Sequence, residues 1–277
     1  MATSRRQFIK LTLNGAVLLG AGGILQAFDN GNKLPPKRKI SLRFVVASDG
    51  HFGQPKTEYA NMHTQMIEWI NAEEKSRGLD FAFINGDMYH DDISFSPIVK
   101  SYWDRLHMPY YVSHGNHDNS NEADWEKAWG KPWHYGFEKG NYAFAVLNTA
   151  NETGKYICPD LEKTRQLLTQ YNQHKMLFVV MHITPVKWTV NGVDCPEVVT
   201  LFNQQANLKA IFNGHDHDQD NVKEKDGKHY FFDSHIGGSW GTNYRGYRIV
   251  EVLKNGDVLT YQMNPSEKLK VNSTTLV

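Results

Sequence analysis

The chain has 277 residues, of which 40% are hydrophobic, so it can bury the core of one large domain. Its 30 basic and 30 acidic residues balance, which disfavours a nucleic-acid polymer or an anionic membrane surface as the partner.

Residues 1–27 differ in composition from the rest of the chain. Arg5 and Arg6 precede an uncharged, mostly apolar stretch over 11–25, and the small residue Ala27 follows it. This arrangement resembles a twin-arginine export signal. A membrane anchor is the alternative, but the stretch is shorter than the roughly 20 residues that cross a bilayer. The resemblance implies a partnership with the twin-arginine export machinery and a periplasmic or extracellular protein.

After a linker over 28–39, short apolar runs alternate with amphipathic segments. Helices are predicted over 61–75, 160–174 and 196–206 from apolar residues at helical spacing. Strands are predicted over 40–47, 79–85, 109–113, 142–148, 176–181, 208–213, 230–233, 247–253 and 258–263. This order predicts a mixed, layered α/β domain over 40–265, followed by a C-terminal tail over 266–277.

Four predicted strands end directly on polar residues that can bind metals. These strand ends are Ser48-Asp49, Asn85-Gly86-Asp87, Met181-His182 and Asn213-Gly214-His215. In layered α/β folds the carboxyl ends of strands are where ligand-binding groups converge. We therefore expect the four segments to meet at one site.

Five blocks of such residues follow one another along the chain. They are Asp49-Gly50-His51, Gly86-Asp87, Gly115-Asn116-His117-Asp118, His182 and Gly214-His215-Asp216-His217. Together, over about 40–220, they resemble the calcineurin-like metallophosphoesterase superfamily. The resemblance implies a four-layer αββα sandwich, with two central mixed β-sheets flanked by helices. It also implies a two-metal enzyme that hydrolyses small phosphomonoesters or phosphodiesters.

The donor atoms of these blocks fit the same chemistry. Carboxylate and amide oxygens combined with imidazole nitrogens suit two ions of Mn, Fe or Zn. The resemblance divides seven ligands between the two ions: Asp49, His51 and His217 on one, Asn116, His182 and His215 on the other, and Asp87 as the bridge. The amide of Asn116 would hold its ion without cancelling the positive charge that binds phosphate.

His117 resembles the family histidine that protonates the leaving oxygen when a water between the two ions attacks phosphorus. Asp118 is the expected partner that orients the His117 ring, and its alternative role is the N-cap of a helix over 119–129. Purple acid phosphatases carry a ligand tyrosine three residues after the bridging aspartate, where this chain has His90. We expect Tyr89, one residue earlier, to point away from the metals and the enzyme to be colourless.

The sequence leaves several roles open. His90 and His114 fit either a supporting or a structural role. The tryptophans within 119–140, Trp188 and the segment 237–245 could surround the substrate or pack in the core, and Arg245 could bind phosphate or lie on the surface. A disulfide between Cys158 and Cys195 is possible in an oxidising compartment.

Two other functions remain as alternatives. One is a phosphodiesterase specialised for nucleotides or lipid head groups. The other, from a different class, is a metal-binding protein that has no catalytic activity.

Overall fold

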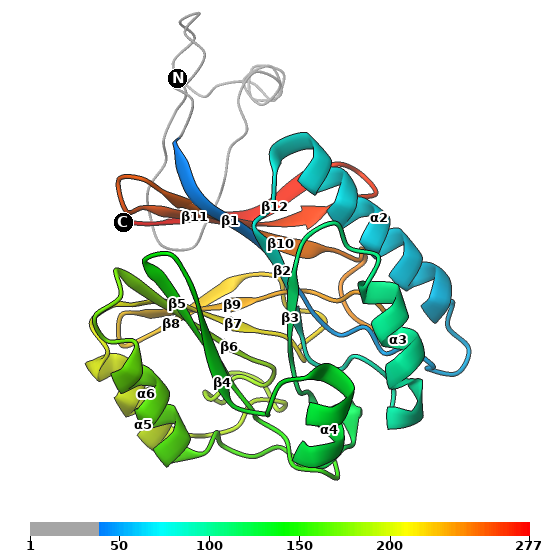
Figure 1. The fold of residues 1–277 in the computed structure, drawn as a ribbon, viewed down its shortest axis with the longest axis horizontal. Helices are drawn as coiled ribbons and strands as arrows, with labels where there is room; N and C mark the ends of the chain where they lie inside the picture. Colours follow the sequence, from blue (N-terminus) through cyan, green and yellow to red (C-terminus); the bar gives the residue numbers. More distant parts are fainter. Residues whose placement is uncertain (1–38) are drawn as a thin grey trace, which may run out of the picture.

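The structure, a computed structural model, describes residues 39–277 (Figure 1). The predicted export signal over 1–27 lies outside the described residues, as does the linker up to residue 38. Over residues 39–277, no helix is both long and apolar enough to span a membrane.

Two mixed sheets, each with six strands within residues 39–277, form the centre of the domain. The first has the strand order β12-β11-β10-β1-β2-β3. Its strands are β1 (Ile40–Ala47), β2 (Phe81–Asn85), β3 (Tyr110–Ser113), β10 (Tyr247–Leu253), β11 (Val258–Asn264) and β12 (Leu269–Leu276). β1, β2 and β3 run parallel, and β10, β11 and β12 add an antiparallel half to the sheet.

Residues 269–276 belong to this sheet and do not form the tail expected over 266–277. β12 pairs antiparallel with β11, from Leu276 opposite Val258 to Leu269 opposite Asn264. The strand is polar and half exposed because it lies at the edge of the sheet, where backbone pairing rather than apolar burial holds it. The domain therefore extends beyond the boundary predicted at residue 265.

The second sheet has the order β4-β5-β6-β7-β9-β8. Its strands are β4 (Tyr135–Lys139), β5 (Tyr142–Leu147), β6 (Met176–Met181), β7 (Leu208–Asn213), β8 (Val222–Lys225) and β9 (Lys228–Phe232). β5, β6, β7 and β9 are parallel, and the antiparallel strands β4 and β8 form the two edges. Neither edge strand was among the predicted elements.

Helices cover the outer face of each sheet (Figure 1). The helices α2 (Tyr59–Arg77), α3 (Ser96–Trp103) and α4 (Glu122–Trp129) pack on the first sheet, and α5 (Leu161–Gln170) and α6 (Pro196–Gln204) pack on the second. Between the sheets lies an aromatic core that includes Phe44, Phe81, Phe144, Phe178 and Phe212. The four-layer αββα sandwich is therefore confirmed.

The helix starts follow from local chemistry. The Asp160 side chain accepts the backbone N–H of Lys163 and caps α5, and Pro196 begins α6, where its missing N–H costs nothing. α4 is capped by Asn121, whose side chain accepts the backbone N–H of Asp124. The helix expected over 119–129 thus begins at Glu122 and does not use Asp118 as its cap.

A disulfide joins Cys158, in the segment after β5, to Cys195, directly before α6. It ties together two loops on the second sheet. This settles the pairing that the sequence left open.

The parallel strands of both sheets end on the same side of the sandwich. Asn85, the last residue of β2, donates from its side chain to the backbone oxygens of Met181 and Phe212 in the other sheet. Asn213, at the end of β7, also donates to Met181. The bonds from Asn85 hold the strand ends of the two sheets together, and the loops that follow these strands carry the polar blocks.

Candidate metal centre

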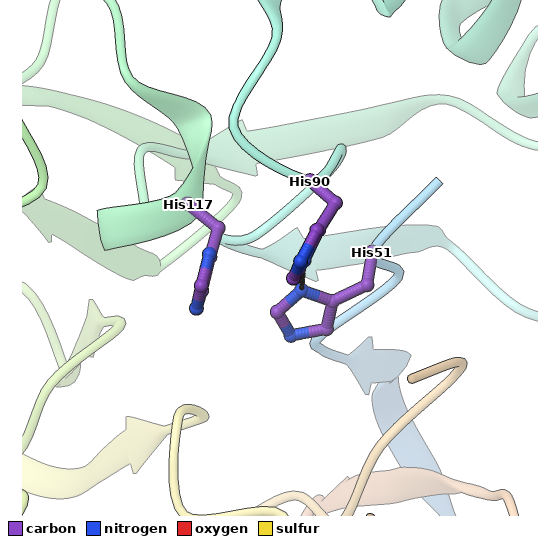
Figure 2. Close-up of side chains that lie close together, drawn as sticks. All are labelled: His51, His90 and His117. Carbon is purple, nitrogen blue, oxygen red and sulfur yellow. Dashed lines mark hydrogen bonds between the residues drawn. The ribbon is translucent and has the colours of Figure 1, made fainter. Parts of the chain in front are cut away.

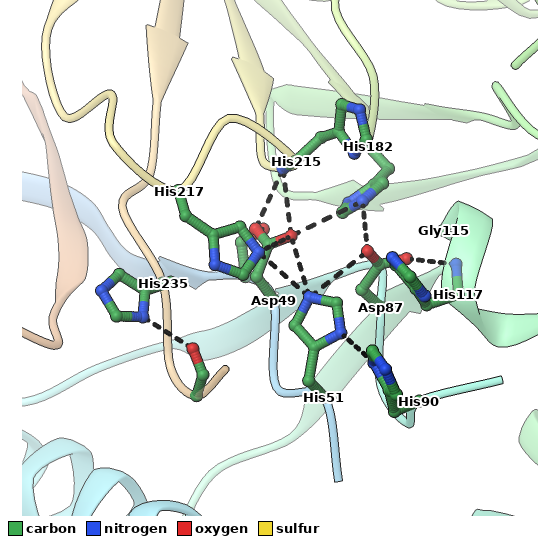
Figure 3. A network of polar contacts seen from close by, with 12 residues as sticks. Asp49, His51, Asp87, His90, Gly115, His117, His182, His215, His217 and His235 are labelled. Atoms are coloured by element: carbon green, nitrogen blue, oxygen red, sulfur yellow. Dashed lines mark hydrogen bonds and ion pairs between the residues drawn. The ribbon is translucent and has the colours of Figure 1, made fainter. Parts of the chain in front are cut away.

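The first group of ligands comes from the loops after β1 and β7. Asp49, His51 and His217 lie together and are buried. His217 Nε2 lies 3.1 Å from Asp49 Oδ1 and 3.0 Å from His51 Nε2 (Figure 3). Asp49 and His51 both have positive φ, so the loop turns sharply and brings both side chains to the same place.

The second group consists of Asp87, His182 and His215, from the loops after β2, β6 and β7. His182 Nε2 lies 3.2 Å from Asp87 Oδ2. The same oxygen lies 3.5 Å from Nε2 of His51 in the first group. Asp87 therefore stands between the two groups, as a bridging ligand must (Figure 3).

Several buried ligand atoms make no hydrogen bond of acceptable geometry with the described residues, although His182 Nε2 and Asp87 Oδ2 face each other at 3.2 Å. These atoms are Asp87 Oδ2, Asn116 Oδ1, His182 Nε2 and His215 Nε2. Buried polar atoms are normally satisfied, so three such atoms in one cluster, with a fourth on the loop next to Asp87, fit a cationic partner. Burial also lowers the pKa of His51 to about 3 and that of His215 to about 4, which keeps these rings in the neutral form that binds metals.

Two carboxylates determine the electrostatics of the centre. Burial alone would lower the pKa of His182, but Asp87 and Asp49 outweigh it and raise that pKa to about 10. Burial would raise the pKa of Asp49, but His217 and His182 hold it below its usual value. A site that favours a proton on a buried imidazole favours cations in general, so a divalent ion can replace that proton.

The imidazole nitrogens that face away from the centre also have partners. His182 Nδ1 lies 2.8 Å from the backbone oxygen of Asn85, which requires a proton on Nδ1 and leaves Nε2 free for a metal. His51 Nδ1 lies 3.1 Å from Nδ1 of His90. His90 thus contacts the back of a metal ligand, a supporting role that the sequence left open.

Glycines allow the loops to approach closely. A Cβ on Gly115 would overlap the carboxylate and the backbone nitrogen of Asp87, although the φ of Gly115 is an ordinary −114°. Gly86 has a φ of 77°, and a Cβ there would overlap the His182 ring. Both positions require glycine, Gly115 for space and Gly86 for space and conformation.

His117 lies at the margin of the centre and is partly exposed. Its backbone N–H donates to Asp87 Oδ1 at 2.8 Å, and its ring lies 4.8 Å from the His51 ring, measured between centroids. The His90 ring stacks on it at 4.7 Å and 13° (Figure 2). Its Nδ1 lies 2.8 Å from Asp91 Oδ1. His117 can therefore present Nε2 to a group bound beside the centre.

The sequence predicted Asp118 as the partner of the His117 ring, but the structure places Asp91 there. The carboxylate of Asp118 is fully buried and accepts the backbone N–H groups of Met88 and Gly115, both at 2.7 Å. It fixes the loops that carry Asp87 and Asn116 and makes no contact with the imidazole. The signal for Asp91 was the acidic pair at 91–92, which begins four residues after Asp87 of the second block.

Tyr89, Trp125 and His114 lie outside the centre, and for Tyr89 this is the orientation that the sequence predicts. Tyr89 and Trp125 are fully buried in the core under α2, α3 and α4, so Tyr89 does not face the metals and Trp125 does not cover the site. His114 is buried against Trp125 and bonds to Asn148, which is a structural role.

The structure also places Arg245 and Trp240, whose roles the sequence left open. Arg245 bonds to Gln65 of α2 and lies over the Trp69 ring, away from the ligands. Trp240, in contrast, stacks directly on His217.

The sequence model of the family described as Calcineurin-like phosphoesterase matches residues 42–219. This chain belongs to that family. No curated protein matches the chain.

Solved structures share its fold. A dimetal phosphatase from Danio rerio superposes with a TM-score of 0.67 at 10% identity, covering 86% of this chain and 99% of that one. GAP50 of Plasmodium, described as the anchor in the inner membrane complex, gives 0.64 at 14% identity over 86% and 89%. A purple acid phosphatase from yellow lupin (Lupinus luteus) seeds gives 0.62 at 13% identity over 84% of this chain and 53% of that chain. At these identities the likeness concerns the fold alone.

Proposed function

We propose that the protein is a two-metal phosphoesterase that hydrolyses a small phosphomonoester or phosphodiester. The observation that carries this proposal is the pair of ligand groups joined by Asp87, with four buried ligand atoms that lack hydrogen-bond partners. Two divalent ions of Mn, Fe or Zn, when bound there, would activate water and neutralise charge on the phosphoryl group.

The chain supplies the remaining parts of the reaction. Asp49, His51 and His217 would hold one ion, and His182 and His215, with Asn116, would hold the other. The backbone bond from His117 to Asp87 fixes the proton donor next to the bridging ligand. His117 would give the proton of Nε2 to the leaving oxygen, and Asp91 accepts the Nδ1–H, which orients the ring and stabilises the doubly protonated form that carries the transferable proton.

The test is the activity of protein reconstituted with Mn, Fe and Zn in turn, on phosphomonoesters and phosphodiesters. His117→Ala should lower the turnover of alkyl esters by about two to four decades and that of nitrophenyl esters much less, because nitrophenolate leaves without a proton. His107→Ala, at an exposed surface histidine, is the matched control and should behave as the parent protein. Full metal occupancy without hydrolysis of any ester would instead indicate a non-catalytic metal-binding protein.

We also propose export by the twin-arginine machinery to the periplasm or the cell exterior. The paired Arg5 and Arg6 support it, and the disulfide fits an oxidising compartment. Replacing both arginines by lysine should retain the protein in the cytoplasm, while Arg38→Lys in the linker should not. Unchanged export of the double variant, measured by cell fractionation, would contradict the proposal.

A further inference from the structure

Trp240 is a large aromatic side chain that stays exposed beside the metal centre. Its ring stacks on the His217 ring at 4.5 Å and 12°, yet 44% of the residue remains accessible to solvent. The rings of His217 and His51 both lie against the indole, and the residue nevertheless stays open to solvent. Trp103 and Trp125, in comparison, are fully buried in the core.

The backbone holds Trp240 at this position. Its carbonyl oxygen faces Nδ1 of His217 at 3.2 Å, so the residue also orients a metal ligand. Gly241, the next residue, has a φ of 129°, and a Cβ there would lie 2.7 Å from the side chains of His217 and His235. The loop is thus packed tightly against the centre, and the indole cannot fold away without disturbing the His217 contact.

A single exposed apolar side chain is ordinary on a protein surface, so the location of Trp240 carries the argument. The His51 ring is a neighbour of both the proton donor and the indole. Its centroid is 4.8 Å from that of His117 and 5.0 Å from that of Trp240, so the two outer rings are at most about 10 Å apart. A leaving group of nucleoside size that is protonated by His117 can therefore reach the Trp240 indole.

Tyr156 provides a useful contrast on the other ion. It is 38% exposed and meets His215 edge to face, at 4.7 Å and 84°. Tyr156 thus lies against His215, in the second group of ligands. His51, which neighbours both His117 and Trp240, is in the first group. Of these two exposed aromatic rings, Trp240 is therefore the one linked to the proton donor.

We propose that Trp240 is a specificity-determining residue that stacks on a planar ring in the leaving group, and that the substrate is a nucleoside phosphate. The inference rests on the proposed phosphoesterase function and names its substrate class. Every nucleobase offers a flat face, and an alkyl or sugar phosphate offers none. Stacking of one base on an aromatic side chain increases affinity by about 5- to 100-fold.

Two esters with the same leaving oxygen test this proposal: adenosine 5′-monophosphate and ribose 5-phosphate, which differ only in the base. The parent protein should show a kcat/KM at least about 5-fold higher for the nucleotide. Trp240→Leu, which keeps an apolar cover on His217, should bring this ratio close to one, and Trp240→Phe should keep most of it. Tyr156→Leu also alters contact with a metal ligand, but should leave the ratio unchanged.

Binding to the metal-loaded protein, measured by calorimetry, separates this inference from the proposed function. If no ester is hydrolysed, the proposed function fails, but tighter binding of the nucleotide than of ribose 5-phosphate, lost in Trp240→Leu, still supports the role of Trp240. If both esters are hydrolysed and bound equally well by the parent protein, the inference is overturned and the phosphoesterase stands. The inference is also overturned if Trp240→Leu keeps the parent's ratio of kcat/KM between the nucleotide and ribose 5-phosphate.

Discussion

Substitutions of Asp91 and Asp118 should have different effects. Asp91 contacts the proton donor His117, whereas Asp118 holds the loops that carry Asp87 and Asn116. We consider Asp91→Ala and Asp118→Asn. Asp91 Oδ1 contacts the His117 ring at 2.8 Å and is half exposed, with 51% of its side chain accessible. Asp118 is fully buried and accepts backbone N–H groups through both oxygens.

The different exposure of the two carboxylates determines how large each effect should be. A hydrogen bond to a charged group is worth about 1.5–3 kcal/mol, and solvent screening of a half-exposed pair brings Asp91 down to about 1 kcal/mol. That corresponds to a roughly 5-fold loss of kcat/KM, which should appear with alkyl esters and be smaller with nitrophenyl esters. Asp118→Asn turns an amide N–H₂ toward a backbone donor, which should cost about 1–3 kcal/mol of unfolding free energy.

The assays are kcat/KM on an alkyl phosphate and on 4-nitrophenyl phosphate, together with urea unfolding of each variant. Asp91→Ala should change the ratio between the two esters while leaving the urea midpoint unchanged. Asp118→Asn should lower the midpoint and affect both esters alike. Equal losses on the two esters for Asp91→Ala, or a change of the ratio for Asp118→Asn, would refute this assignment of roles.

Three further outcomes are expected. His90→Phe keeps the stacked ring but removes the contact to His51 Nδ1, so metal affinity in a calorimetric titration should fall about 10- to 100-fold, and unchanged affinity would exclude a supporting role. Replacing Cys158 and Cys195 by serine should lower the unfolding free energy by roughly 2 to 4 kcal/mol in a urea titration, because the unfolded chain gains freedom. Burial lowers the pKa of His63 from 6.5 to about 4, so the unfolded chain binds the proton first and stability should fall from about pH 6.5 to pH 4. This loss should reach up to about 3 kcal/mol, and urea midpoints of His63→Gln across that range should be flatter.

The ligand types and the mixed α/β order of the elements followed from local patterns, and the four-layer sandwich from the family resemblance. Four of the five ligand blocks stand directly after an apolar strand, so the strand run and the candidate metal-binding residues can be read together from one short segment. β1, β2, β6 and β7 were predicted because strands buried on both faces are continuous apolar runs.

The edge strands could not be found in this way. β8 is Val-Lys-Glu-Lys and β12 is mostly polar, so neither carries the pattern of a buried strand. Their stability comes from backbone hydrogen bonds to one neighbour, and those neighbours are known only once the sheet is assembled.

The sequence by itself determined the chemical groups of the candidate centre: carboxylate, amide and imidazole side chains, with one further histidine beside them. Only the tertiary structure decided which side chains serve that histidine. Asp118 is adjacent to His117 in sequence but turns into the loops, while Asp91, 26 residues away, reaches the ring. Likewise Trp125 enters the core and Trp240 lies over a ligand. The physical reason is that side-chain direction depends on backbone turns and long-range packing, which residue spacing does not encode.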